Sequence, residues 1–145
     1  MKLDKYVAVL ALVACSDQNG LPTEPVRLDD TWLYYREDHC FEVHPPDQEL
    51  GLPGDTLLFA CGVVAIEFQD STTWNDANAV IADIPQAHLK NWFPANSMLG
   101  PWLMWVTLHV PVGTEKPAIE RARRHAKVKW AGLVHVRISP PPRLF

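Results

Sequence analysis

The last third of the chain holds a strand, a helix and a second strand in succession, and this order restricts the fold more than any other feature. The segment "PWLMWVTLHVPV", residues 101–112, is typical of a buried strand. Thr114 can cap a helix over 115–129 that tolerates Pro117 in its first turn, and "GLVHVRIS", residues 132–139, predicts another strand. The simplest connection is a right-handed crossover between neighbouring parallel strands, with the helix covering one face of the sheet.

Side-chain alternation assigns the residues of these two strands to opposite faces of the sheet. The face expected under the helix carries Leu108, Val110, Val112, Val134, Val136 and Ile138, against a helix stripe of Ile119, Ala122, Ala126 and Trp130. The other face carries Trp105, Thr107, His109, His135 and Arg137.

The two histidines and the arginine on that second face are the candidate catalytic or anion-binding residues. Imidazole titrates near neutral pH, and guanidinium pairs with phosphate or carboxylate. His109, His135 and Arg137 beside Trp105 therefore predict either a small enzyme or an anion-binding protein. The alternative is a solvated sheet face on which each histidine bonds to its neighbours.

The remainder of the chain reads as strands followed by helices. Strands are predicted at 31–36, 40–44 and 56–68, the first two joined as a hairpin, and helices at about 72–84 and from Asp83 to Phe93. At 145 residues and 48% hydrophobic, the chain is the size of one ordinary domain. We expect a single compact α+β domain over residues 1–139 with a mixed β-sheet, and a proline-rich tail over 140–145.

The N-terminal segment "KYVAVLALVACSDQNG" has two incompatible interpretations. Its apolar residues on both faces predict a buried central strand over 6–15. The alternative, indicated by the lysines before it and the "LVAC" sequence, is a bacterial lipoprotein signal, cleaved before an acylated Cys15. No apolar run approaches the roughly eighteen residues that span a bilayer.

The cysteine count depends on the same choice. Three cysteines with no CxxC pair favour free thiols in a reducing compartment, so we expect a cytoplasmic protein. If Cys15 carries lipid, Cys40 and Cys61 remain as a pair able to form one disulfide in the envelope.

Charge is divided unevenly along the chain. Residues 1–114 carry fifteen acidic and five basic side chains, and residues 115–145 carry two acidic and eight basic ones. A basic helix face with Arg121, Arg124 and Lys127 could bind an acidic partner, or it could pack against the acidic surface of its own fold. Nucleic acid is a less favoured partner, because the net charge is -4.

A weak metal-binding pattern lies at Cys40, Glu42 and His44, which share one face of a predicted strand. Each of these side chains can bind zinc. Residues two apart in a strand are separated by about 7 Å, which is unfavourable for convergence on one ion. We expect no metal site here and no cofactor.

The sequence as a whole favours a non-catalytic protein-interaction or assembly module that binds a protein partner or itself. Six tryptophans support this hypothesis, since tryptophan and arginine are favoured at interface hot spots. Trp32, Trp74, Trp92 and Trp102 are the candidates for contact with a partner. No glycine-rich phosphate loop, GxSxG, HExxH or CxxC motif is present.

Overall fold

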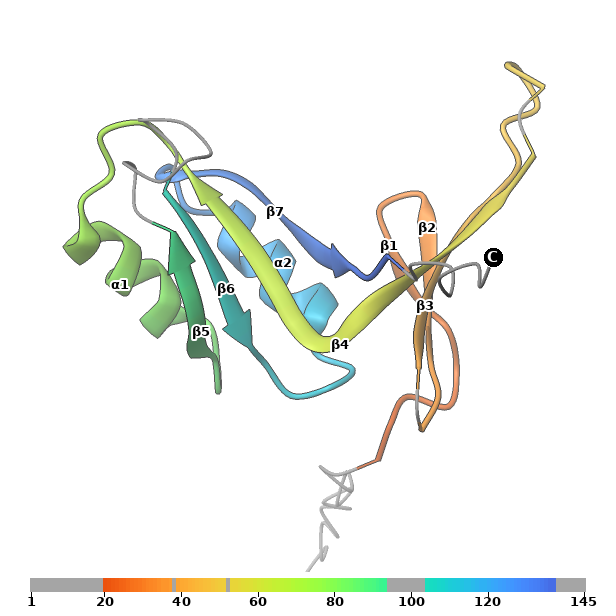
Figure 1. The fold of residues 1–145 in the computed structure, drawn as a ribbon, viewed down its shortest axis with the longest axis horizontal. Coiled ribbons are helices and arrows are strands. Elements are labelled where there is room, and N and C mark those ends of the chain that lie inside the picture. The colour runs from red at the N-terminus through yellow and green to blue at the C-terminus, as the bar shows by residue number, and fades with distance from the viewer. Residues whose placement is uncertain (1–19, 38, 52, 94–103, 138–145) are drawn as a thin grey trace, which may run out of the picture.

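The described residues form a seven-stranded antiparallel sheet with two helices (Figure 1). The computed structural model describes residues 20–37, 39–51, 53–93 and 104–137. Its elements are β1 (Val26–Leu28), β2 (Thr31–Tyr35), β3 (Cys40–His44), β4 (Asp55–Phe68), α1 (Trp74–Asp83), β5 (His88–Phe93), β6 (Trp105–His109), α2 (Glu115–Arg123) and β7 (Val128–His135). The α+β class is confirmed, but the mixed sheet is wrong, because every strand pair is antiparallel.

Strand β4 is fourteen residues long and belongs to two parts of the sheet. Its first part, from Asp55 to Phe59, pairs with β3, and its second part lies between β6 and β7. The two parts meet at Gly62, which has a positive φ of 68°. A Cβ at this position would lie 2.8 Å from the carbonyl oxygen of Val110. The bend visible in β4 in Figure 1 therefore requires glycine.

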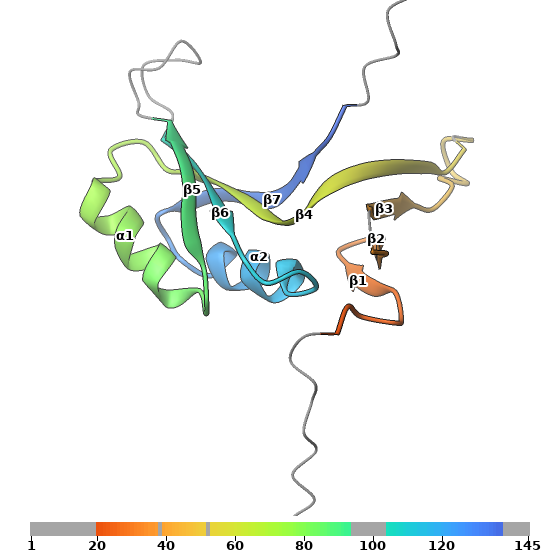
Figure 2. The ribbon, with the colours of Figure 1, turned by 60° about the horizontal axis from the view of Figure 1, so that its bottom comes forward.

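The six elements from β4 to β7 form a β-α-β-β-α-β unit with strand order β7-β4-β6-β5. This is the split β-α-β arrangement of ferredoxin-like folds. Figure 2 shows α1 and α2 on the same side of this sheet. β6 and β7 both pair with β4, so they run parallel to each other but are separated by it. The predicted crossover between neighbouring strands is therefore wrong.

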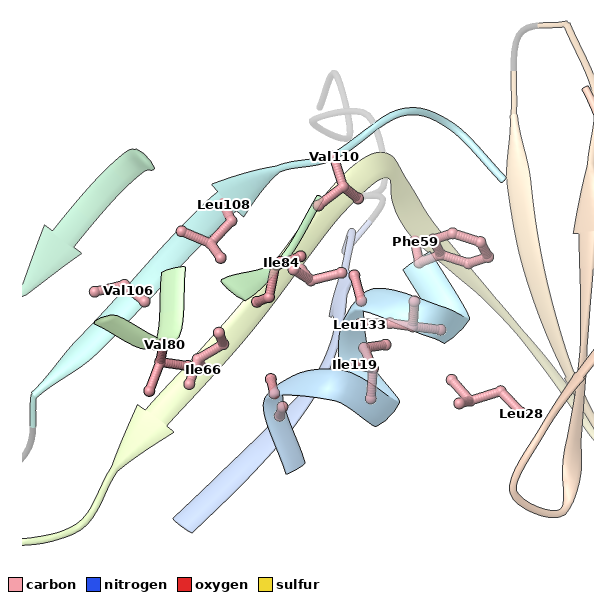
Figure 3. Close-up of a cluster of buried hydrophobic side chains, with 14 of the residues drawn as sticks. Leu28, Phe59, Ile66, Val80, Ile84, Val106, Leu108, Val110, Ile119 and Leu133 are labelled. Atoms are coloured by element: carbon pink, nitrogen blue, oxygen red, sulfur yellow. The ribbon is translucent and has the colours of Figure 1, made fainter. Parts of the chain in front are cut away.

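The core lies between the helices and one face of the sheet (Figure 3). Alternate β4 residues Val64, Ile66 and Phe68 point into it and are at most 1% exposed. The other strands and the helices contribute Val106, Leu108, Ala131, Leu133, Ala77, Val80, Ile119 and Ala122. Each large apolar side chain buried here contributes about 1.5–3 kcal/mol relative to exposure.

Two helix predictions need correction. The helix predicted over 83–93 is wrong: α1 ends at Asp83, Gln86 turns with a positive φ, and β5 follows. Pairing with β6 places Leu89 opposite Leu108. The helix predicted over 115–129 ends instead at Arg123, because residues from Val128 onward pair with β4. Tertiary pairing overrides local helix propensity in both segments.

The hairpin, the long strand at 55–68 and the helix at 74–83 agree with the sequence predictions. Thr73 caps α1 through a reciprocal capping box with Asp76. No helix in the described ranges is long and apolar enough to cross a membrane. The strand predicted over 6–15 lies outside the described residues, as does Trp102.

Glu115 is fully buried at the first position of α2 and joins three parts of the fold. Its Oε1 accepts from the Gly62 N–H at 2.6 Å, and its Oε2 accepts from the Gly113 N–H at 2.7 Å and from the Tyr35 hydroxyl at 2.9 Å. Burial, and then the Glu115 carboxylate, raise the pKa of Tyr35 well above its usual value. The hydroxyl therefore remains a donor, and β2, the β4 bend and the start of α2 are held together.

Candidate functional site

The predicted site of His109, His135 and Arg137 does not form. His109 pairs with Val63 across one edge of β4, whereas His135 pairs with Phe59 across the other edge. Arg137 is exposed beyond the end of β7. The alternation of β7 is also opposite to the prediction, because Ala131 and Leu133 face the helices.

His135 instead contacts Glu42 of β3, and His44 of the same strand approaches the same carboxylate. The Nε2 of His135 lies 2.5 Å from Oε2 of Glu42, and the Nε2 of His44 lies 3.4 Å from the same oxygen. Oε1 of Glu42 accepts from the Thr31 hydroxyl at 2.8 Å. Glu42 is only 7% exposed. Its carboxylate has partners on three strands, β2, β3 and β7.

The surroundings of Glu42 change its titration. Burial alone would raise the pKa of Glu42, but hydrogen bonds from His135 and Thr31 and the charges of both histidines lower it below its usual value. A carboxyl whose pKa is lower in the folded state stabilises the fold above its unfolded pKa. That contribution is lost as the pH falls through the folded pKa.

We expect Glu42→Gln to lower the free energy of unfolding by about 1–2 kcal/mol at pH 7, since it removes a charged acceptor from a buried network. The difference from the unchanged protein should shrink as the pH falls below about 4, the ordinary range of a carboxyl. Urea unfolding at a series of pH values measures this. Glu49→Gln, at an exposed position, is the control. A difference that stays constant down to pH 2 would contradict the assignment.

The state of Cys40 and Cys61 contradicts the prediction of free thiols and excludes Cys40 as a metal ligand. Cys40 and Cys61 form a disulfide with a Cα–Cα distance of 5.5 Å. The prediction of free thiols is therefore wrong for this pair, and Cys15 lies outside the described residues. Cys40 is unavailable as a ligand beside Glu42 and His44. Within the described ranges, no group of three or more His, Cys, Asp or Glu side chains is arranged to hold a metal ion.

The basic residues of α2, and Lys127 in the turn after it, are largely engaged with acidic residues of the same fold. Arg121 pairs with Asp83 at 3.1 Å, and Lys127 lies 3.7 Å from Asp76. Arg124, the third predicted binding residue, caps the end of α2 and is exposed. The interpretation of the charge division as packing within one fold agrees with these pairs, and the helix offers little unpaired charge.

Trp105 lies on the sheet face opposite the helices, where its ring is 5.7 Å from that of Trp130. Gly132 lies beneath this pair, since a Cβ there would come 2.3 Å from the Trp130 ring. Trp105 is only partly exposed because Trp130 covers it.

The structure reveals an exposed aromatic surface on the opposite side of the hairpin from Glu42. Trp32 and Tyr34 of β2 are 39% and 38% exposed, and they lie opposite Val43 and Phe41 of β3. We call these four residues the aromatic face. The alternation of both strands produces it, because Thr31, Leu33, Tyr35, Cys40 and Glu42 point inward.

The aromatic face is hollowed by a groove of about 290 Å³ lined by Tyr34, Arg36, Phe41, Val43 and Thr56. At the other end of the face, the guanidinium of Arg27 lies 5.8 Å from the centroid of the Trp32 ring. Arginines therefore flank exposed rings at both ends. The sequence analysis named Trp32 as a candidate contact residue, but it missed Tyr34 and Arg36.

A larger cavity of about 490 Å³ lies where the end of α1 meets the start of α2. Its lining is Ile84, Pro85, Gln86, Pro111, Thr114, Pro117, Ala118 and Arg121. Its one charged side chain, Arg121, is bonded to Asp83. This lining provides neither a nucleophile nor an acid–base pair.

No family model, curated protein or solved structure matches this chain.

Proposed function

We propose that this chain is a non-catalytic protein-interaction domain and that the aromatic face is its contact surface. The observation that carries the proposal is the exposure of Trp32 and Tyr34 beside Phe41 and Val43 on one continuous strand face. Tryptophan, tyrosine and arginine dominate binding energy at protein interfaces. A face that combines tryptophan and tyrosine, with Arg27 and Arg36 at its two ends, has the composition of a hot spot.

The rigidity of the hairpin supports the same proposal. Cys40 begins β3 directly before Phe41, and its disulfide to Cys61 fixes β3 to β4. Tyr35, next to Tyr34, is bonded to buried Glu115. A surface fixed in this way loses little conformational entropy on binding, which favours affinity.

The alternatives have less support. The enzyme hypothesis needs His109, His135 and Arg137 together, and β4 separates the two histidines. Binding of nucleic acid through α2 needs unpaired cations, and Arg121 and Lys127 have acidic partners. A protein partner on the aromatic face requires neither.

Photo-crosslinking in native cells tests the contact surface. The photoreactive residue p-benzoylphenylalanine in place of Trp32 is expected to give one discrete adduct, which should disappear when Tyr34→Ser is added. The control places the photoreactive residue at Trp74, which is 37% exposed and so as accessible as Trp32 at 39%. Equal adducts at both positions, or an adduct insensitive to Tyr34→Ser, would contradict the proposal. An adduct with twice the mass of the chain would identify a second copy as the partner.

We also propose that the domain works in an oxidising compartment, to which a lipid on Cys15 anchors it. Structural disulfides persist in such compartments, and this fold has one between Cys40 and Cys61. The "LVAC" sequence before Ser16 supports acylation. This alternative now has more support than a cytoplasmic location, which rested on free thiols.

Intact-mass analysis of the protein from its native source tests the anchor. We expect residues 1–14 to be absent, lipid to be added at Cys15, and the Cys40–Cys61 bond to be oxidised. A full-length chain with an unmodified Cys15 would exclude the lipid anchor.

A further inference from the structure

The sheet has three edge strands among the described residues, β1, β5 and β7. An edge strand carries unpaired backbone N–H and C=O groups that can bind a strand of another chain, and a short strand or charged side chains oppose this. β1 is only three residues long. At β7, the Arg123 guanidinium donates to the Ala131 carbonyl at 3.1 Å and is itself paired with Asp29. Both of these edges therefore carry a feature that opposes pairing.

β5 is the third edge, and it is the most exposed strand of the sheet. All six of its residues are exposed, and within the described part of the chain it pairs only with β6. Leu89, Trp92 and Phe93 are 40%, 51% and 40% exposed. The ring of Trp92 lies 5.3 Å from that of Trp74 at the start of α1. The β5 edge thus combines a free strand backbone with large apolar side chains, which is the combination that binds another strand.

A bulge in the middle of β5 changes the alternation of its side chains. Leu89 pairs with Leu108 and Asn91 pairs with Thr107, so Lys90 is left out of the ladder to β6. A lysine within an edge strand normally opposes pairing. Here the bulge removes Lys90 from the row of paired residues, so five of the six residues remain for a ladder.

The bulge also places Leu89 and Trp92 on the same face of the sheet. Their β6 partners, Leu108 and Val106, both point into the core, so both side chains lie on the side of the helices. Without the bulge, residues three apart in a strand would point to opposite faces. The face away from the helices carries His88, Asn91 and Phe93. The two halves of β5 therefore match each other about Asn91.

This symmetry fits a second copy of the same strand. Two copies of β5 can pair antiparallel about a twofold axis at Asn91, which makes the same surface complementary to itself. In this register, Leu89 of each copy lies opposite Trp92 of the other, and His88 lies opposite Phe93. Aromatic and aliphatic side chains that face each other across strands stabilise the pairing. The two Asn91 amides meet on the axis, where each can donate to and accept from the other.

We propose that two copies of this chain form a dimer through antiparallel pairing of their β5 strands, which joins their sheets edge to edge. β5 lies at the opposite end of the sheet from the β1–β2–β3 part (Figure 1). The dimer therefore leaves the aromatic face of both copies free, and the two surfaces act independently of each other.

Disulfide trapping tests the register of the pairing. In a Cys15→Ser background, Asn91→Cys adds one thiol that should meet its own copy on the axis. Directly opposed residues lie about 4.5–5.5 Å apart between Cα atoms, within the range of a disulfide. Oxidised glutathione should therefore yield a covalent dimer, seen on a non-reducing gel.

His88→Cys in the same background is the matched control, because this residue is also exposed and on the same face as Asn91. Its two copies would be displaced by roughly 13 Å along the strands, at about 3.3 Å per residue, which is too far for a disulfide. A covalent dimer from Asn91→Cys and none from His88→Cys supports the proposal. Equal yields from both variants, or no dimer from either, would overturn it.

Light scattering tests the association without a crosslink. The Cys15→Ser chain should have about twice the monomer mass of 16.4 kDa. Trp92→Lys should weaken association about tenfold or more, because it removes the same apolar contact twice. Leu50→Lys, at an apolar position that is 72% exposed, should leave the mass unchanged, and circular dichroism should show both variants folded. A monomer at every concentration, or equal effects of the two lysines, would contradict the dimer.

The same measurement separates this dimer from binding at the aromatic face. Tyr34→Ser should leave the dimer mass unchanged, because Tyr34 lies on β2 at the far end of the sheet. Loss of the dimer in Tyr34→Ser would overturn the assignment to β5 and would place the contact between copies on the aromatic face instead.

Discussion

Glu115→Ala is expected to lower the free energy of unfolding by about 3–5 kcal/mol, the cost of breaking a buried charged hydrogen-bond network. Its carboxylate accepts from Gly62, Gly113 and the Tyr35 hydroxyl, and it is fully buried. Alanine leaves these three donors in the interior without an acceptor. Because stabilities of single domains are only about 5–15 kcal/mol, the variant should be largely unfolded in mild urea.

Two comparisons make this result specific. Tyr35→Phe removes one donor and keeps the ring, so it should cost only about 1–2 kcal/mol. Glu120→Ala on the same helix removes an exposed carboxylate 3.7 Å from Lys116, and it should change stability by less than about 0.5 kcal/mol. Urea unfolding followed by tryptophan fluorescence measures all three. Equal effects of Glu115→Ala and Glu120→Ala would contradict the network.

Reduction of the Cys40–Cys61 bond is expected to lower the free energy of unfolding by about 3 kcal/mol, because the intact bond closes a loop of 21 residues in the unfolded chain. Cys40→Ala combined with Cys61→Ala should reproduce the loss. Cys15→Ser, which leaves the Cys40–Cys61 bond intact, is the matched control for replacing a cysteine. Thiol titration of the denatured, unreduced recombinant chain should find one free thiol. Three thiols, or equal stability with and without reductant, would contradict the bond.

The hairpin could be predicted from sequence because the short polar segment "EDH" separates two strand-like runs. In "TWLYY", Thr31, Leu33 and Tyr35 point inward, and the two residues between them point outward. β7 offers no such clarity, since Leu133 and Val134 are adjacent apolar residues. A change of one residue in alternation reverses the faces of a strand. Because of this one-residue error, the sequence analysis placed His135 on the sheet face away from its actual partner, Glu42.

Contacts that depend on strand order could not be predicted. Glu42 and His135 are 93 residues apart, and they meet only because β3 and β7 both pair with β4. The neighbouring strands predicted for 101–112 and 132–139 are separated by β4 for the same reason. Local patterns give strands and their faces, whereas long-range pairing decides which side chains come together.

Counting cysteines failed for a different physical reason. An odd number suggested free thiols, but the pairing depends on which cysteines the fold brings within bonding distance. The antiparallel pairing of β3 with β4 brings Cys40 close to Cys61, independently of Cys15.

The long strand β4 also determines how the molecule carries mechanical load. A pull on the hairpin along the strand direction acts on the hydrogen bonds of β4 to β3, β6 and β7 together, because one chain segment takes part in all three ladders. These bonds lie perpendicular to antiparallel strands, so such a pull shears many of them at once instead of opening them one after another. The Cys40–Cys61 bridge crosses the same joint covalently. Tension between the hairpin and the β4–β7 unit would therefore be borne by one continuous strand and by the bridge together.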